Sequence, residues 1–252
     1  LRSSQLDFFK EELSKTLIRT TRKESGINFP LRNVKSICIK PSKEELNVIE
    51  ILRLMSLELK DKNKGKNVKS LSLLSLNLSF CSHPLALRSA IVRNYLKKSK
   101  YSNEIINLID QCIPSSKEKK LYEIINDEKD KQIIIFVERL ETGRYLSSKI
   151  NENLGECKFF HGGLTLKERD NMVQEFRKKT YKYLILTSAG SEGLNLQNSH
   201  ILINFDLHWN PLKIEQRIGR VHRYGQEKEV KIYNLSVEGT IEDRILMYIF
   251  NK

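Results

Sequence analysis

The second half of the chain alternates short apolar runs with helical patterns, and this alternation constrains the fold more than any other feature. The apolar runs predict five strands, at residues 133–137, 158–160, 183–187, 201–205 and 230–235. The segments between them predict helices at about 142–151, at 165–178, from Pro211 onward and at 240–250. Strands covered on both faces are apolar throughout, and strand–helix alternation is typical of a parallel sheet. We therefore predict an α/β fold, with a parallel sheet and helices on both faces.

Residues that begin helices support these boundaries. Thr165 with Glu168 has the spacing of a capping box, and Ser42 with Glu45 has the same spacing. Pro211 suits the first position of a helix, where its missing N–H costs nothing. We expect a helix to begin at each of these three places.

The first half of the chain is predicted to be mainly helical, with polar connectors at residues 61–70, 96–103 and 114–117. Lysine side chains are usually solvated, so we expect these connectors on the surface. Most of the formal net charge of +13 falls in this half. Such an excess favours a polyanionic partner.

Composition excludes several classes of protein. With 39% hydrophobic residues, the chain can build a packed core and is not expected to be disordered. No apolar run approaches the roughly 20 residues of a membrane span, and no signal peptide begins the sequence. The four cysteines are scattered, which favours free, buried thiols in a reducing compartment. Because the sequence begins at Leu1, we expect it to be a fragment of a longer protein.

Polar clusters follow four of the five predicted strands. They are Glu138-Arg139, His161-Gly162-Gly163, residues 188–195 and residues 206–211. The carboxyl ends of parallel strands meet at one edge of a sheet, where ligands bind. We therefore expect these clusters to form one site. Their glycines would let backbone N–H groups approach a phosphate.

The segment 214–226, IEQRIGRVHRYGQ, carries three arginines with little local countercharge. Arg217, Arg220 and Arg223 are spaced three apart, so on a continuous helix their guanidinium groups would form one stripe. Glu215 is the only acid within the segment. Guanidinium groups bind phosphate oxygens in pairs, which makes a nucleotide phosphate a suitable partner. The alternative is a solvated helix face.

This arginine segment resembles motif VI of superfamily-two helicases. Its HRYGQ ending is similar to the Swi/Snf-type branch, the ATP-driven translocases of duplex DNA. Stretches that resemble the preceding motifs come in the expected order, at 131–137, 159–176, 184–196 and 206–211. In the first half, residues 17–23 with Phe29-Pro30 are similar to the family's inter-lobe connection, and residues 76–85 to its CNHP helix. The resemblance thus covers nearly the whole chain.

The resemblance implies the second RecA-like lobe of such a translocase. It implies an inter-lobe connection over 1–40, a helical insertion over 41–120 and the RecA-like lobe over 121–252. The sequence has no G-x-x-x-x-G-K-[ST] loop and no acidic DEAH-like box. We therefore expect a first lobe of the same polypeptide to hold the ATP phosphates and Mg²⁺, and we expect the 252-residue chain alone to be inactive.

The resemblance also assigns roles to individual residues. Arg220 and Arg223 would be arginine fingers, supported by Gln216 and Arg217. The nucleotide site would include Gly193, Asn195 and Arg217. Contacts to double-stranded DNA would come from His161, Gly162, Gly163, Thr187 and Ala189, with Trp209 beside the DNA path.

Simpler interpretations stay open for several of these residues. Asn195 could be a turn residue, Thr187 a strand residue and Trp209 a packing residue. His83 and His222 are expected to be structural hydrogen-bonding residues. Glu138 departs from the family, which usually has Ser-Gln after the phenylalanine, and a carboxylate there would not attract a DNA phosphate.

Two other functions remain as alternatives to a duplex-DNA translocase. One is a lobe of a strand-separating DNA or RNA helicase, and the other is a non-enzymatic module that binds DNA or a protein. The expected location is intracellular, in the cytoplasm or nucleoid of a prokaryote or in the nucleus of a eukaryote. No membrane partner is expected.

Overall fold

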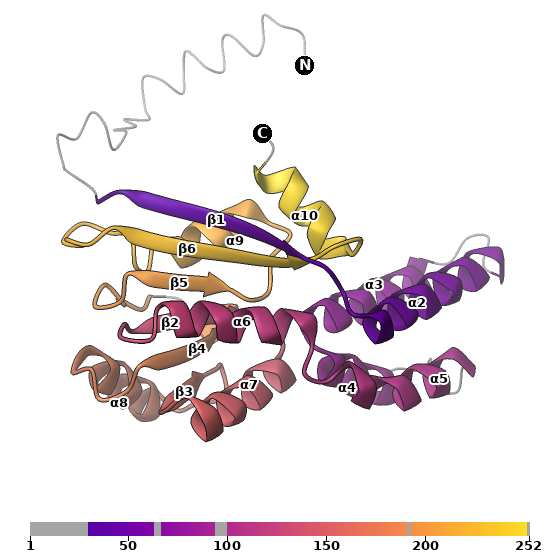
Figure 1. The fold of residues 1–252 in the computed structure, drawn as a ribbon, viewed down its shortest axis with the longest axis horizontal. Coiled ribbons are helices and arrows are strands. Elements are labelled where there is room, and N and C mark those ends of the chain that lie inside the picture. The colour runs from indigo at the N-terminus through magenta and orange to yellow at the C-terminus, as the bar shows by residue number, and fades with distance from the viewer. Residues whose placement is uncertain (1–29, 63–66, 94–99, 191–192, 251–252) are drawn as a thin grey trace, which may run out of the picture.

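A six-stranded sheet forms the centre of the larger part of the molecule (Figure 1). The computed structural model describes residues 30–62, 67–93, 100–190 and 193–250. The strands are β1 (Arg32–Ile39), β2 (Ile133–Val137), β3 (Cys157–Phe160), β4 (Tyr183–Thr187), β5 (Ile201–Asn204) and β6 (Val230–Val237). Their order across the sheet is β1-β6-β5-β2-β4-β3, and every neighbouring pair is parallel. The predicted α/β fold is therefore confirmed.

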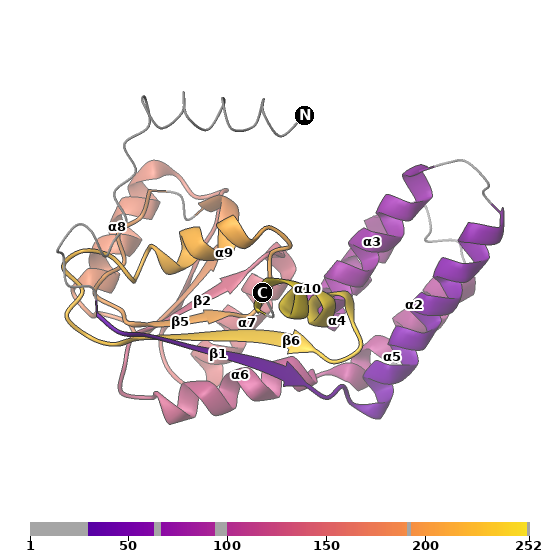
Figure 2. The ribbon, with the colours of Figure 1, turned by 90° about the horizontal axis from the view of Figure 1, so that it is seen from above.

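Helices cover both faces of this sheet (Figure 2). On one face lie α6 (Ser116–Asp127) and α7 (Leu140–Asn153), and on the other lie α8 (Leu166–Arg177), α9 (Pro211–Ile218) and α10 (Ile241–Phe250). The side chains of β2 alternate between the two cores, with Ile135 in one and Ile134 in the other. All five residues of β2 are buried. Burial on both faces explains why this strand is apolar throughout.

The strand β1 was missed by the sequence analysis. It lies within the residues expected to connect two lobes, yet it pairs with β6 from Arg32 to Ile39. Its sequence mixes polar and apolar residues because β1 is at the edge of the sheet and only partly covered. Arg32 also forms two hydrogen bonds with Glu215 of α9, at 2.7 and 2.9 Å. The segment 17–23, which resembles the inter-lobe connection, lies outside the described residues.

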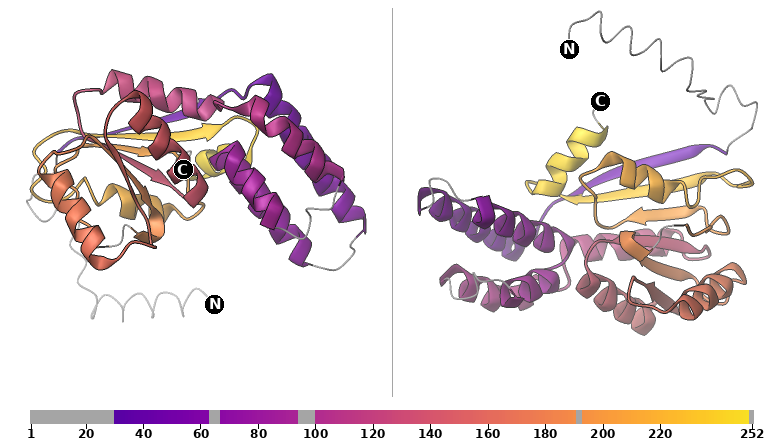
Figure 3. Two further views of the ribbon diagram at one scale, coloured as in Figure 1. Left: turned by 90° about the horizontal axis from the view of Figure 1, so that it is seen from below. Right: turned by 180° about the vertical axis from the view of Figure 1, so that it is seen from behind.

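A second group of helices lies beside the carboxyl ends of the strands (Figure 3). It contains α2 (Lys43–Lys62), α3 (Asn67–Ser82), α4 (Pro84–Arg93) and α5 (Lys100–Ile109), followed by a short 3-10 turn at Asp110–Cys112. These helices share a hydrophobic core of their own, which includes Leu52, Leu76, Leu87 and Ile105. The mainly helical character of the first half is therefore confirmed.

Two of the three predicted connectors are shorter than expected. α2 continues through Lys62 and α3 begins at Asn67, while α5 begins at Lys100. Lysine is a good helix former, so a lysine-rich stretch need not end a helix. The third connector precedes α6 as predicted, but its Lys117 is wrongly predicted to be solvated. The Lys117 side chain is only 2% exposed.

The predicted helix starts are confirmed. Ser42 Oγ accepts a hydrogen bond from the Glu45 N–H at 3.2 Å, and the Glu45 carboxylate accepts one from the Ser42 N–H at 2.7 Å. Thr165 and Glu168 form the same capping box before α8. Pro211 begins α9 after Asn210, whose side chain caps the helix. Each cap satisfies backbone N–H groups that the first turn leaves free.

The cysteines and the hydrophobic segments agree in part with expectation. All four cysteines are free thiols; Cys81, Cys112 and Cys157 are buried, whereas Cys38 is exposed. Cys38 lies on the edge strand β1, which accounts for the difference. Among the described residues, none of the helices combines the length and apolar character needed to cross a membrane.

Candidate functional site at the carboxyl ends of the strands

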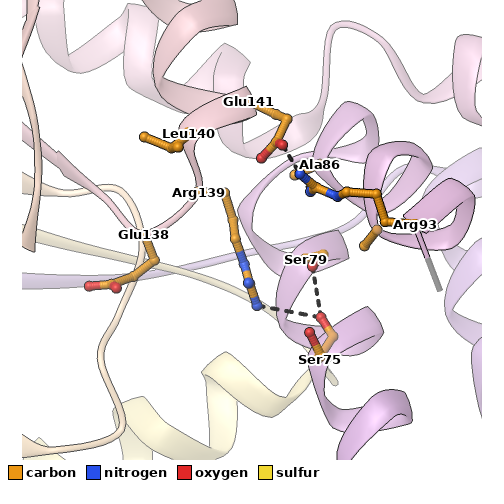
Figure 4. Close-up of a pocket in the computed structure, with 9 residues that line it drawn as sticks. Ser75, Ser79, Ala86, Arg93, Glu138, Arg139, Leu140 and Glu141 are labelled. Carbon is orange, nitrogen blue, oxygen red and sulfur yellow. Dashed lines mark hydrogen bonds and ion pairs between the residues drawn. The ribbon is translucent and has the colours of Figure 1, made fainter. Parts of the chain in front are cut away.

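The polar clusters after β2 and β5 meet where the sheet faces the helical group. Glu138 and Arg139 line a hollow of about 390 Å³ opposite Ser75 and Ser79 of α3. Figure 4 shows Arg139 reaching toward Ser75, whose carbonyl oxygen lies 3.5 Å from its guanidinium. Arg93 closes the far side through an ion pair with Glu141 at 2.8 Å. The hollow therefore lies between the sheet and the helices α3 and α4.

A second, smaller cavity adjoins this hollow. It has a volume of about 220 Å³ and shares Glu138 and Arg139 with the first. Its other walls are Leu78 of α3 and residues of the β5–α9 loop, which spans residues 205–210, together with Glu242. Trp209 is 68% exposed and stacks on His208, with 5.6 Å between the ring centroids. Trp209 is thus a surface side chain at the mouth of a cavity rather than a packing residue.

Arg217 is buried at the centre of the site. Its guanidinium pairs with the Glu138 carboxylate at the end of β2. It also donates to Ser188 Oγ after β4 at 2.8 Å, to Asn204 Oδ1 at 3.0 Å and to the Asp206 carbonyl oxygen at 2.7 Å. The side chain is 2% exposed. Arg217 therefore joins the ends of β2, β4 and β5 to α9.

The electrostatics of Arg217 follow from this burial. Removal from water lowers the pKa of the Arg217 guanidinium, because desolvation penalises the charged form. The carboxylates of Glu138 and Asp206 act in the opposite direction and favour that charge. Glu138, which was expected only to weaken a DNA contact, here supplies the countercharge that local sequence did not show.

The prediction that the three arginines form a stripe on one helix face is wrong. α9 ends at Ile218 with Gly219 as its C-cap, so Arg220 and Arg223 lie beyond the helix in successive turns. Arg217 is buried, Arg220 is half-buried and Arg223 is exposed. Among the described residues, no carboxylate forms an ion pair with Arg220 or Arg223. The three arginines thus have different environments, and only the last two have guanidinium groups without an acidic partner.

The segment after β4 is fastened to the arginine segment. The Leu196 N–H donates to the Arg220 carbonyl oxygen at 3.2 Å. The Gln226 side-chain amide donates to the carbonyl oxygens of Gln197 and Val221 at 2.9 and 3.2 Å. Gly193 precedes these contacts and has a φ of +82°, a conformation that favours glycine.

The predicted nucleotide residues lie on two segments, the loop after β4 and α9, and the loop is bonded to Arg220 just beyond α9. Asn195 is next to the anchored Leu196, and its side-chain oxygen accepts a hydrogen bond from the Gln197 N–H at 3.2 Å. Asn195 therefore stabilises a turn, and its contact with a nucleotide stays a prediction. Gln216 is exposed on α9, one residue before the buried Arg217. Gly193 is exposed at the start of the same loop.

The loop after β3 presents its glycines to solvent. Gly162 and Gly163 are exposed, and the Gly163 N–H donates to His161 Nδ1 at 3.1 Å. Arg169 of α8 holds the loop from behind by donating to the carbonyl oxygens of Leu164 and Gly162, at 3.0 and 2.5 Å. The loop is therefore fixed by α8 while its glycine backbone remains open to a ligand.

Thr187 ends β4 and is 6% exposed. Its hydroxyl has no hydrogen-bond partner among the described residues, and a buried polar group without a partner is uncommon. Ala189 follows in the 3-10 turn Ser188–Gly190. A side chain at Gly190 would approach the His161 backbone at 3.2 Å, so the turns after β3 and β4 are in close contact.

The two histidines expected to be structural have hydrogen-bonding positions. His83 is buried, with Nε2 3.4 Å from the Glu118 carboxylate, and its Nδ1 accepts from the Leu85 N–H at 3.2 Å. His222 Nε2 lies 2.9 Å from the Pro30 carbonyl oxygen. Within the described ranges, no group of three or more His, Cys, Asp or Glu side chains is arranged to hold a metal ion.

Sequence reasoning missed a buried charge cluster beneath this site. Lys117, Asp206 and Glu242 are each about 2% exposed and come from α6, the β5–α9 loop and α10. In the sequence, Asp206 is 89 positions and Glu242 is 125 positions from Lys117. No periodicity or motif spacing could have paired them.

Comparisons with known proteins agree with this architecture. Residues 116–225 match the family of helicase conserved C-terminal domains. The uncharacterized ATP-dependent helicase YqhH of Bacillus subtilis (strain 168) is 34% identical over 255 residues, which cover 98% of this chain and 44% of YqhH. The putative ATP-dependent helicase/translocase YwqA of the same strain is 29% identical over 94% of this chain and 25% of YwqA. The chain spans less than half the length of either relative.

A solved structure from an archaeon shares the fold. The Sulfolobus solfataricus SWI2/SNF2 ATPase core in complex with dsDNA has a TM-score of 0.64 and 25% identity, over 98% of this chain and 50% of that chain. The sheet and the helical group are thus both similar to parts of one known ATPase core.

Proposed function

The chain carries a helicase conserved C-terminal domain and has the fold of SWI2/SNF2 ATPase C-terminal lobes, and from this premise we propose that it is the second motor lobe of an ATP-dependent translocase on double-stranded DNA. In this proposal the lobe supplies arginine fingers to ATP bound by a first lobe. It also contacts the phosphates of one DNA strand.

One observation carries the nucleotide part of the proposal. Arg217 uses its donors within the fold, whereas Arg220 and Arg223 have no carboxylate partner among the described residues. The Arg220 carbonyl oxygen accepts from Leu196 in the loop that contains Gly193 and Asn195. The Arg223 carbonyl oxygen accepts from the Gln226 N–H, and the Gln226 side chain donates to Gln197 of the same loop. Two guanidinium groups on a held backbone, without an acidic partner, suit the charge that builds on phosphoryl oxygens during transfer.

The role of Arg217 in this proposal is to support the fingers rather than to contact the nucleotide. Its guanidinium anchors the end of α9, so the residues that follow start from a fixed point. Gln216, exposed beside it, is the candidate to contact or orient the reacting groups. ATP phosphates and Mg²⁺ are assigned to the first lobe, because this sequence has no phosphate loop.

The loops after β3 and β4 support the DNA part of the proposal. In this proposal the exposed Gly162 N–H donates to a phosphate oxygen, and the Gly163 N–H exchanges its His161 Nδ1 partner for one. The Thr187 hydroxyl is buried and has no partner within the described fold. Backbone amides and hydroxyl groups contact phosphates without reading sequence, as a translocase requires. Trp209 lies at the same end of the sheet and would border the DNA path.

The experiment compares nucleic acids as activators of the full-length protein that contains this chain. ATP turnover is measured with Mg²⁺ alone, with duplex DNA and with single-stranded DNA or RNA of equal length. Stronger activation by the duplex supports the proposal. Preference for a single strand would favour a strand-separating helicase, and turnover that ignores every nucleic acid would contradict both.

A further inference from the structure

The Lys117 ammonium is enclosed by acceptors from three other parts of the chain. Its Nζ lies 2.7 and 3.0 Å from the two Glu242 carboxylate oxygens, 2.8 Å from the Cys81 carbonyl oxygen and 3.3 Å from Asp206 Oδ1. It also lies 4.7 Å above the centroid of the Phe205 ring. One buried cation thus joins α6, α10, the end of α3 and the start of the β5–α9 loop.

Stability alone is a poor reason for this cluster. Two carboxylates and one ammonium are buried together, and burial raises the pKa of Glu242 to about 7. Removing such charges from water is costly, and apolar residues of similar volume often serve stability as well or better. Buried ionic groups can instead specify one arrangement of the chain, because their partners must occupy fixed positions.

The cluster fixes the beginning of the β5–α9 loop. Asp206 Oδ2 accepts from Ser82 Oγ at 2.7 Å and from the Glu138 N–H at 2.6 Å. Glu242 Oε1 accepts from the Leu207 N–H at 3.1 Å. Asp206 and Leu207, the second and third residues of the loop, are therefore held through carboxylates: Asp206 by its own and Leu207 by that of Glu242 on α10. Lys117 contacts both carboxylates.

We infer that Lys117 and Glu242 are positioning residues for the β5–α9 loop, holding Trp209 in place from beneath. The DNA contribution of that loop rests on the proposed function, but the positioning itself does not. The charge cluster also contacts the end of α3, through Cys81 and Ser82. A shift of α3 would therefore move the loop. Both side chains are only 2% exposed, and Glu242 reaches no further than the inner wall of the smaller cavity that Trp209 borders.

The test begins with Trp209, because it is the only tryptophan in the chain. Time-resolved fluorescence anisotropy of the 252-residue chain reports how freely the loop moves, without any ligand. Glu242→Gln keeps the size of the side chain and removes its charge, and Lys117→Met is the second variant. Both are expected to enlarge the fast component of the Trp209 anisotropy decay.

The matched control is Glu128→Gln. Glu128 is also a buried carboxylate, 4% exposed, and is bonded to Lys231 and Tyr233. It lies near the amino ends of the strands, away from the β5–α9 loop. Thermal unfolding identifies temperatures at which all variants remain folded. The inference is overturned if the cluster variants leave the decay unchanged, or if Glu128→Gln changes it equally.

The same variants in the full-length protein separate this inference from the proposed function. The duplex-DNA concentration that gives half-maximal ATP turnover should rise about fivefold or more in Glu242→Gln, the lower end of usual coupling between sites. It should remain the same in Glu128→Gln. A more mobile Trp209 with an unchanged half-maximal concentration would support the positioning and contradict the proposed DNA role of the loop.

Discussion

The Arg217 guanidinium and the Glu138 carboxylate form an ion pair across 79 sequence positions, joining α9 to the end of β2. The pair is asymmetric, because the Arg217 side chain is 2% exposed and that of Glu138 is 31% exposed. Loss of the carboxylate would leave a buried cation unpaired. Loss of the cation would leave a carboxylate that water can still reach.

We predict that Glu138→Ala destabilises the chain by about 3 kcal/mol, at the lower end for breaking a buried pair because Glu138 is partly hydrated. Glu138→Gln should cost less, since its amide oxygen can still accept from Arg217. Arg217→Met should cost at least as much as Glu138→Ala, because it also leaves the buried Asn204 side-chain oxygen and the Asp206 carbonyl oxygen without a donor. Urea unfolding of the single and double variants measures the coupling directly. Additive effects in the double variant would show that the pair contributes no coupling energy.

The two unpaired arginines lead to a prediction for catalysis. In the full-length protein, Arg220→Ala and Arg223→Ala should each lower ATP turnover about 10³-fold or more, as expected for arginine fingers. The affinity for duplex DNA should change little, because these side chains would face the nucleotide. Arg144→Ala, an exposed arginine on α7, is the control. Unreduced turnover in either variant would remove that residue from the catalytic site.

The strands and their polar ends could be predicted because each depends on local sequence. Residues 133–137 and 183–187 are buried on both faces, so their apolar runs match the observed strands residue for residue. The edge strand β1 was missed for the opposite reason. Half-covered strands carry polar residues, and RNVKSICI gives no continuous apolar signal.

The environments of charged residues could not be predicted in the same way. Arg217 has no nearby acid in sequence, and its countercharge comes from a strand end far along the chain. Lys117 lies in a polar stretch that suggests a solvated connector, yet tertiary contacts bury it against Glu242. The predicted arginine stripe is wrong because α9 ends at Ile218, and its C-cap Gly219 is a residue compatible with both helix and turn.

Acid stability should depend on Glu128. Burial alone would raise its pKa, but hydrogen bonds from Lys131, Lys231 and Tyr233 outweigh it and lower the pKa to about 2, from a usual value near 4.5. A lowered carboxylate pKa stabilises the fold above pH 4.5, and this contribution is lost as the pH falls from 4.5 toward 2. The difference corresponds to at most about 3 kcal/mol.

Comparing the chain with Glu128→Gln at several pH values isolates this contribution. The free-energy difference between the two proteins should be largest above about pH 5 and should shrink as the pH falls. The opposite effect of Glu242, whose pKa is raised to about 7, is common to both proteins and cancels. A difference that stays constant from pH 7 to about pH 3 would show that the Glu128 pKa is not lowered.

The 252-residue chain alone should not hydrolyse ATP. Catalysis in the proposed motor requires phosphates and Mg²⁺ held by one lobe and arginines supplied by the other. Phosphate release is measured for the chain with and without duplex DNA, beside the full-length protein under the same conditions. DNA-stimulated turnover by the chain alone would contradict the assignment of ATP binding to the first lobe.

DNA binding by this lobe is expected to be electrostatic and insensitive to sequence. Base-edge contacts would hold a translocase at one site, whereas phosphate contacts fix orientation without carrying sequence information. Each phosphate contact releases counterions, so the logarithm of the affinity should fall by about 0.9 per contact for each tenfold rise in salt. With one lobe's share of the contacts, we expect a dissociation constant on the order of micromolar or weaker.

The measurement titrates the chain with duplexes of different sequence at several salt concentrations. Thr187→Val is an informative variant, because it replaces the unpartnered hydroxyl with a methyl group of similar size. If that hydroxyl bonds a phosphate, the affinity should fall about fivefold, the value of a single hydrogen bond. The salt slope should stay the same, since the hydroxyl carries no charge. Strong preference for one sequence, or affinity that ignores salt, would favour a specific DNA-binding module instead.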